Sequence, residues 1–351
     1  MTAVHTPVPS GLRQRVIDLY LILRVSTLGF TLMLPLLGAA FAQGAWSAAH
    51  SAWLLAVALA FHAFAYMLND VVDLDIDRTE AQRFDSPLVR GTMSPRVVLV
   101  VALVSVPVAF GLAWAGGLSL PWLALAFAAM AAYDVWGKRC RWPLVTDAVQ
   151  ALGWCALMVV GVPDGAATWS HAWLAAYLFV CVLIVQGVHG GLRDLANDRR
   201  RGARTTAAWL GALERPGAGV DLPPRFVAYA ASLQAVMIAS ACGVWWTARD
   251  AGASIGGHAG AGAVAVASLV VAGASLLFAW RRRSDARALV NAGAWHIVAS
   301  LVVPLALASA SLPAAGVALL AAVFALPVAA MWAYNGTHWH LTPPLPGEAA
   351  R

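Results

Sequence analysis

Residues 53–78 read WLLAVALAFHAFAYMLNDVVDLDIDR, a long apolar run that ends in four aspartates. With the residues before it, the apolar part covers about 51–70, close to the ~20 residues that a helix needs to cross a bilayer. It shows no alternation of apolar and polar residues, so a helix is favoured over a barrel strand. The segment therefore predicts a membrane-spanning helix with acidic side chains at one membrane edge.

The rest of the chain contains further apolar segments of similar length. Of the 351 residues, 61% are hydrophobic and 11% charged, whereas about 25% are charged in soluble proteins. About ten segments are candidate spans: 19–41, 51–70, 96–115, 119–136, 144–162, 172–191, 226–247, 261–280, 290–310 and 312–334. We predict an all-α, polytopic helical membrane bundle. Its expected parts are an N-terminal cytoplasmic segment (1–18), a single transmembrane domain (19–334) and a C-terminal tail (335–351).

Basic residues predict the orientation of the bundle. Arginines cluster before the first span and after the second, fourth, sixth and eighth, while the loops on the other face carry one basic residue, Arg249. This bias places the N-terminus and the arginine-rich loops in the cytoplasm. The net charge of +6 is then a sign of topology and gives no reason to expect nucleic-acid binding. We predict a multi-pass protein of the cytoplasmic membrane, with its functional loops on the cytoplasmic side.

The aspartates after the second span form a candidate cation site. Asp70, Asp73 and Asp77 are spaced i, i+3, i+7, so they lie on one stripe of a helix, whereas Asp75 points away. Three carboxylates on one stripe repel each other, and the negative end of the helix dipole adds to this cost. Hard oxygen ligands of this kind select Mg²⁺. Asn69 adds an amide beside them.

A second acidic pair follows the sixth span, in HGGLRDLANDRRRGARTT (189–206). Asp194 and Asp198 are spaced i, i+4 and are expected on one helix face, on the same side of the membrane as the first cluster. Lys138, the chain's one lysine, lies after the fourth span with Arg139. Carboxylates that hold Mg²⁺, together with ammonium and guanidinium groups, are suited to a diphosphate. Solvated loop charges are the plain alternative for either cluster alone.

These residues resemble the UbiA superfamily of intramembrane prenyltransferases. Residues 69–78 match its NDxxDxxxD motif, residues 194–198 look like its DxxxD motif, and Tyr133 with Lys138 and Arg139 resembles its Tyr and Lys-Arg elements. Residues 86–91, SPLVRG, look like its RPLxxG element. The chain departs from the family pattern at Ser86, where the family has arginine, and at Gly191, where many members have another acid.

The resemblance implies a helical bundle around a central cavity that opens to the lipid, usually of nine transmembrane helices, so with the ten segments counted above we expect nine to ten. Two Mg²⁺ would bind an isoprenyl diphosphate donor, and the allylic cation would alkylate a small acceptor, aromatic or a quinone precursor. The implied metal-binding and catalytic residues are Asp70, Asp73, Asp77, Asp194 and Asp198. The implied diphosphate-binding residues are Asn69, Arg90, Tyr133, Lys138 and Arg139.

Two other functions compete with this one. An intramembrane terpene cyclase would bind the same donor, but its prenyl chain would attack itself. A non-catalytic transporter would need polar residues along a path to the far face, whereas the acids here cluster at one edge. The expected partners are therefore an isoprenyl diphosphate, a small-molecule acceptor and the lipid bilayer, with no nucleic acid.

Overall fold

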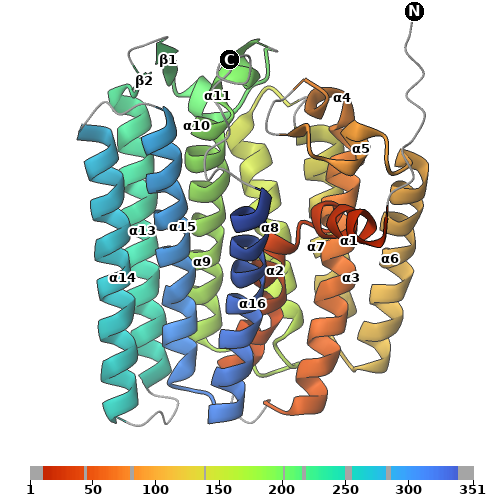
Figure 1. Ribbon diagram of the computed structural model, residues 1–351. Helices are drawn as coiled ribbons and strands as arrows, with labels where there is room; N and C mark the ends of the chain where they lie inside the picture. The colour runs from red at the N-terminus through yellow and green to blue at the C-terminus, as the bar shows by residue number, and fades with distance from the viewer. Residues whose placement is uncertain are drawn as a thin grey trace, which may run out of the picture.

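The computed structural model describes residues 11–42, 46–79, 83–137, 140–200, 202–215, 219–249, 255–281 and 286–338. Within these ranges the long helices run side by side as one bundle (Figure 1). They are α2 (Val25–Ala40), α3 (Ala48–Val72), α6 (Pro95–Ala115), α7 (Leu120–Trp136), α8 (Pro143–Val160), α9 (Trp169–Leu183), α13 (Pro224–Arg249), α14 (Ile255–Arg281), α15 (Ala286–Ser309) and α16 (Ala314–His338). The prediction of an all-α helical bundle is confirmed.

The apolar helices occupy the predicted segments. Among the described residues, six helices are long and apolar enough to cross a membrane, and the count is seven if α1 (Leu12–Ile22) and α2 form one bent span. Shorter apolar stretches lie at Leu120–Trp136, Ala259–Ala274 and Ala314–Ala330. Together these helices account for all ten segments expected from the sequence.

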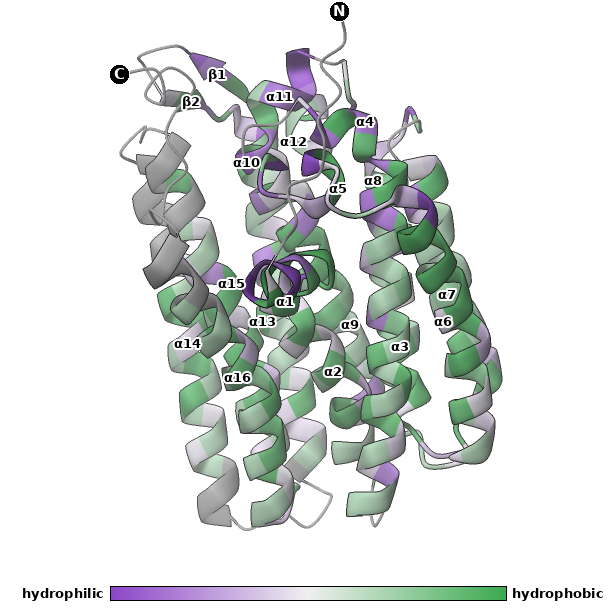
Figure 2. Ribbon diagram, turned by 45° about the vertical axis from the view of Figure 1, so that its right-hand side comes forward, coloured by the Kyte–Doolittle hydropathy of each residue, from purple (hydrophilic) through white to green (hydrophobic). Residues whose placement is uncertain are grey.

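One end of the bundle carries most of the polar structure (Figures 1 and 2). The short elements there are α4 (Leu74–Asp77), α5 (Pro87–Arg90), α10 (Gly191–Arg193), α11 (Leu195–Arg200), α12 (Thr206–Trp209) and an antiparallel hairpin of β1 (Leu213–Arg215) and β2 (Gly219–Asp221). Both acidic segments therefore lie at the same end of the bundle, as the loop charges predicted.

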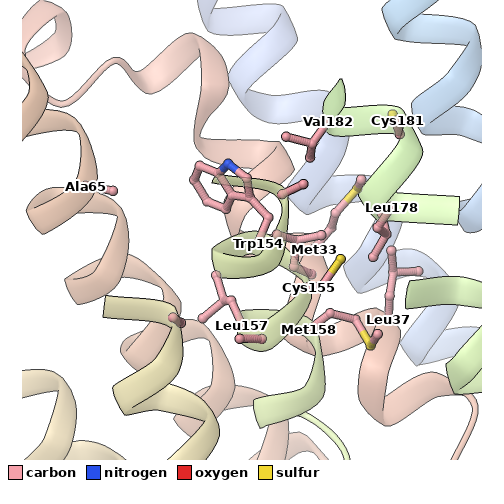
Figure 3. Packing of buried hydrophobic residues seen from close by; sticks show 14 of the residues in the cluster. Met33, Leu37, Ala65, Trp154, Cys155, Leu157, Met158, Leu178, Cys181 and Val182 are labelled. Atoms are coloured by element: carbon pink, nitrogen blue, oxygen red, sulfur yellow. The ribbon is translucent and has the colours of Figure 1, made fainter. Parts of the chain in front are cut away.

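The core beneath this end is built from aromatic and aliphatic side chains of α2, α3, α7, α8 and α9 (Figure 3). The ring of Phe61 lies edge-on to Phe127 at 5.1 Å and to Trp154 at 5.6 Å between centroids, an arrangement that aromatic rings favour. Phe61 is fully buried. This packing holds α3, α7 and α8 together below the acidic end.

Helices α2 and α8 approach each other through glycines. A methyl group at Gly161 would collide with the backbone carbonyl of Pro35, and one at Gly38 with that of Met158. We expect Gly161→Ala to destabilise the fold by about 1–3 kcal/mol, because the two backbones must separate. Thermal unfolding in detergent measures this effect. Gly111→Ala is the matched control, since a Cβ there meets nothing within 4 Å, and an equal loss in both variants would contradict the packing argument.

Candidate active site

A cavity of about 440 Å³ lies at the polar end of the bundle, within the range of ~300–1,000 Å³ typical of ligand sites. Its lining comes from the α1–α2 junction, α3, α4, the loop before α5, α7, α8, and the segment from η3 (Ile184–Gly190, a π-helix) to Asp194. The cavity thus joins the two acidic segments, which are over a hundred residues apart in the chain.

The first aspartate stripe faces this cavity as predicted. Asp70, Asp73 and Asp77 all line it, and each is only 4% exposed. Asp75 lies outside it, with a side chain that is 91% exposed and an ion pair to Arg78. Helix α3 ends at Val72 and α4 follows after Asp73, whose backbone is also helical, and the Asp77 N–H donates to the Asp73 carbonyl at 2.9 Å. The stripe therefore survives the break between the two helices.

Asn69 connects two of the buried carboxylates. Its Nδ2 donates to Oδ2 of Asp73 at 3.0 Å and to Oδ1 of Asp134 at 3.1 Å. Asp134, on α7, is itself 4% exposed and lines the cavity. The sequence analysis missed this acid, although its place at the end of an apolar run, directly after Tyr133, is a usable signal. Tyr133 lines the cavity as predicted.

Arg24 is the second residue that the sequence analysis missed. Its guanidinium forms an ion pair with Asp70, donates to Oδ1 of Asn69 at 3.2 Å and lies 5.3 Å from the ring centroid of Tyr66. A guanidinium offers several donors in one plane, which suits it to carboxylates and phosphates. Arg24 thus brings a positive charge into a cavity otherwise dominated by carboxylates.

The predicted span 19–41 is bent at Arg24. Helix α1 ends before it, α2 begins after it, and the two axes differ by 47°. Arg24 has a φ of 43°, a left-handed conformation that costs a non-glycine residue energy and is held only by its surroundings. The contacts of its side chain with Asp70 and Asn69 supply those surroundings.

Two more arginines, Arg83 and Arg193, line the cavity. Nε of Arg83 lies 3.7 Å from Oδ1 of Asp77, and Arg193 reaches Asp194 through two bonds of 2.7 and 2.6 Å. Burial raises the pKa of Asp77, and the positive charge of Arg83 opposes this rise. The charge of Arg24, together with burial, lowers the pKa of Arg83. Asp77 is therefore protonated more readily than a carboxyl group in water, and a proton competes with any cation for its carboxylate oxygens.

The second acidic segment is only partly in the cavity. The chain passes from the π-helix η3 through α10 to Asp194, whose ψ of 3° interrupts the helix before α11. Asp194 lines the cavity, but Asp198 on α11 is not among the described lining residues. The turn between the two residues is nevertheless α-helical, because the Asp198 N–H donates to the Asp194 carbonyl at 2.9 Å, so the expected i, i+4 spacing lies within one helical turn.

Three predicted diphosphate-binding residues remain: Arg90, Lys138 and Arg139. Arg90 does not line the cavity within the described part of the chain: its Nη2 donates to Oδ1 of Asp18 at 2.6 Å and its Nε to the carbonyl of Asp85 at 3.1 Å. Asp85 and Ser86 do line it, so Arg90 fixes the loop that forms one wall. Lys138 and Arg139 lie outside the described residues.

The donor set suits Mg²⁺ bound together with a ligand. Among the described residues, no three His, Cys, Asp or Glu side chains converge closely enough to hold a metal ion by themselves. Mg²⁺ is normally bound by one or two carboxylates, with water and substrate phosphates completing its shell. Asp70, Asp73, Asp77 and Asp194 offer carboxylate oxygens of this kind around one cavity, so they fit a Mg²⁺-diphosphate better than a bare metal ion.

The fold and this cavity define a multi-pass helical membrane protein with an acidic, arginine-containing site at one end of the bundle. The chain belongs to the UbiA prenyltransferase family, because the model of that family matches residues 31–293. The family resemblance expected from the aspartate motifs is thereby confirmed.

Solved structures show the same fold. The apo structure of a UbiA homolog from Aeropyrum pernix K1 is 19% identical, with a TM-score of 0.61, and the match covers 84% of this chain and 98% of that one. A UbiA homolog from Archaeoglobus fulgidus bound to DMAPP and Mg²⁺ is 17% identical, with a TM-score of 0.57, covering 82% and 98%. A digeranylgeranylglyceryl phosphate synthase is 12% identical, with a TM-score of 0.58, covering 85% and 99%. A search of curated proteins found no match.

Proposed function

We propose that this protein is a Mg²⁺-dependent intramembrane prenyltransferase that moves an isoprenyl group from an allylic diphosphate to a small acceptor, aromatic or a quinone precursor. The observation that carries the proposal is the cavity in which Asp70, Asp73, Asp77 and Asp194 meet Arg24 at one end of an apolar bundle. Membership of the family supports it, as do the homologs from Archaeoglobus fulgidus bound to DMAPP or GPP with Mg²⁺.

The proposed metal shell has two parts, one on each acidic segment. Asp70, Asp73 and Asp77 would hold one Mg²⁺ together with the donor diphosphate, and Asp194 with Asp198 a second. When bound, Mg²⁺ supplies positive charge to the diphosphate oxygens and makes the diphosphate a better leaving group. In this proposal Asn69 keeps the carboxylates of Asp73 and Asp134 in place through its two hydrogen bonds.

The cationic side chains would take up the rest of the diphosphate charge. Arg24 already lies in the cavity, with Arg83 and Arg193 at its wall, and Lys138, Arg139 and Tyr133 are the further contacts that the family motif suggests. Fixed positive groups stabilise charge as it develops on a leaving group without having to reorganise. Arg90 is a positioning residue in this proposal, since it holds the loop of Asp85 and Ser86.

The inner part of the cavity suits the prenyl chain and the reaction. Ala65, Tyr66, Met130 and Trp154 line it below the carboxylates. The allylic carbon–oxygen bond breaks, its electron pair leaves with the diphosphate, and a carbon of the acceptor forms the new bond and then loses a proton. Apolar walls keep out water, which would otherwise capture the cation. The proposed location is the cytoplasmic membrane, with the cavity facing the cytoplasm.

Product analysis by mass spectrometry tests the proposal. The purified protein is incubated with Mg²⁺ and allylic diphosphates of increasing chain length, each with and without aromatic acceptors. A prenylated acceptor that forms only with Mg²⁺ is the expected product. A cyclic hydrocarbon or alcohol formed without any acceptor would instead establish the cyclase, and no turnover of any donor would overturn both.

A further inference from the structure

A second cavity lies at the same end of the bundle, outside the carboxylate site. Its volume is about 820 Å³. The residues that define it, here named the arginine–tryptophan pocket, are Arg141, Trp142, Arg199, Gly202, Ala203, Arg204, Ala208 and Trp209. They come from the start of α8 and from the α11–α12 segment, which Figure 2 shows at the polar end of the bundle. None of them lines the carboxylate cavity.

The charge of this pocket is positive and uncompensated within the described part of the chain. Three of its eight lining residues are arginines and none is acidic. In the described ranges, no carboxylate oxygen lies within 4.0 Å of the guanidinium of Arg141, Arg199 or Arg204. By contrast, each of six other arginines forms an ion pair with an aspartate: Arg24, Arg78, Arg83, Arg90, Arg193 and Arg215. Three like charges around one hollow favour an anion bound between them.

Trp142 places this pocket at the edge of the apolar bundle. Trp142 is the N-cap of α8, a candidate span, and is 52% exposed, while Trp209 is 45% exposed. Exposed tryptophans at the ends of spans lie at the level of the lipid headgroups. The guanidinium of Arg141 lies 5.3 Å from the ring centroid of Trp142, so charge and aromatic surface occur side by side. This combination suits a ligand that has an anionic head and an apolar body.

We infer that the arginine–tryptophan pocket binds the phosphate headgroup of an anionic membrane phospholipid. Basic pockets at the ends of membrane helices are a known form of headgroup recognition. The guanidiniums would contact the phosphate oxygens, and the tryptophans would lie against the glycerol and the first acyl carbons. A bound lipid would hold the α11–α12 segment, which directly follows Asp194. The inference does not depend on the proposed transferase activity.

Native mass spectrometry of the detergent-solubilised protein tests this site. The protein is titrated with phosphatidylglycerol and, separately, with zwitterionic phosphatidylcholine. We expect preferential binding of phosphatidylglycerol, and a loss of about thirtyfold in its affinity in Arg199→Gln/Arg204→Gln, the size expected for two basic groups near an anionic surface. The matched control is Arg15→Gln/Arg96→Gln, which removes the same charge from two exposed arginines outside the pocket. Equal affinity in both double variants would overturn the inference.

Two further measurements separate loss of the site from misfolding and a lipid phosphate from a soluble one. Ala203→Glu adds a negative charge to the pocket and is expected to weaken phosphatidylglycerol binding, whereas Ala203→Gln keeps it; unfolding temperatures are compared for both. Inorganic pyrophosphate is titrated in parallel. If pyrophosphate binds the pocket as tightly as the lipid and displaces it, the ligand is a soluble phosphate and the lipid assignment is wrong.

Discussion

Asp70→Asn is expected to lower the rate of Mg²⁺-dependent diphosphate release by at least about a hundredfold, the size seen when a group that stabilises the charge of a transition state is removed. Asp70 is 4% exposed, lines the cavity and is the ion-pair partner of Arg24. The substitution keeps the shape of the side chain but removes the charge that a divalent cation needs. The release of inorganic diphosphate, measured at saturating donor and Mg²⁺, reports the effect.

The control for this substitution lies five residues away. Asp75→Asn changes the same chemistry on the same segment, but the side chain is 91% exposed and points out of the cavity. We expect its rate to stay within about twofold of the unsubstituted protein, because an exposed ion pair contributes little. Equal losses in Asp70→Asn and Asp75→Asn would show that charge on this segment matters without regard to the cavity.

Arg24→Gln is expected to lower kcat/KM by roughly a hundredfold, with most of the loss in kcat, because a fixed charge that faces the leaving group acts chiefly in the transition state. The substitution also leaves Asp70 buried without its partner, so the unfolding temperature should fall. Arg24→Lys restores the charge but not the planar donors, and it should recover only part of the activity.

The control for Arg24→Gln is the same substitution at an exposed arginine. Arg15→Gln removes an exposed arginine from the preceding helix and should leave both kcat and KM unchanged. If Arg24→Gln raises KM alone, Arg24 stabilises the bound donor and the transition state equally, and it has no special role in the departure of the diphosphate.

The sequence predicted the features that depend on local pattern. The ten apolar segments follow from length and composition, and the stripe of Asp70, Asp73 and Asp77 follows from the period of a helix, which the short α4 continues. The same reasoning correctly placed Asp75 outside. These features need no knowledge of which helices are neighbours.

The features that the sequence did not predict depend on contacts between distant segments. The break at Arg24 is held by Asp70 and Asn69, about 45 residues further along the chain, and Asp134 reaches Asn69 from another helix. The π-helix before Asp194 changes the helix period locally, and the sequence did not predict it. Irregular backbone of this kind gathers at functional sites.

The most direct test of the central claim is whether the carboxylate cavity binds an allylic diphosphate through a divalent cation. Calorimetric titration with geranyl thiolodiphosphate, a poorly reactive donor analogue, measures this affinity with Mg²⁺ and with EDTA. We predict tight binding only with Mg²⁺ for the unsubstituted protein and for Asp75→Asn, and loss of that binding in Asp77→Asn. Binding of equal strength in EDTA, or undiminished binding in Asp77→Asn, would contradict the assignment of this cavity.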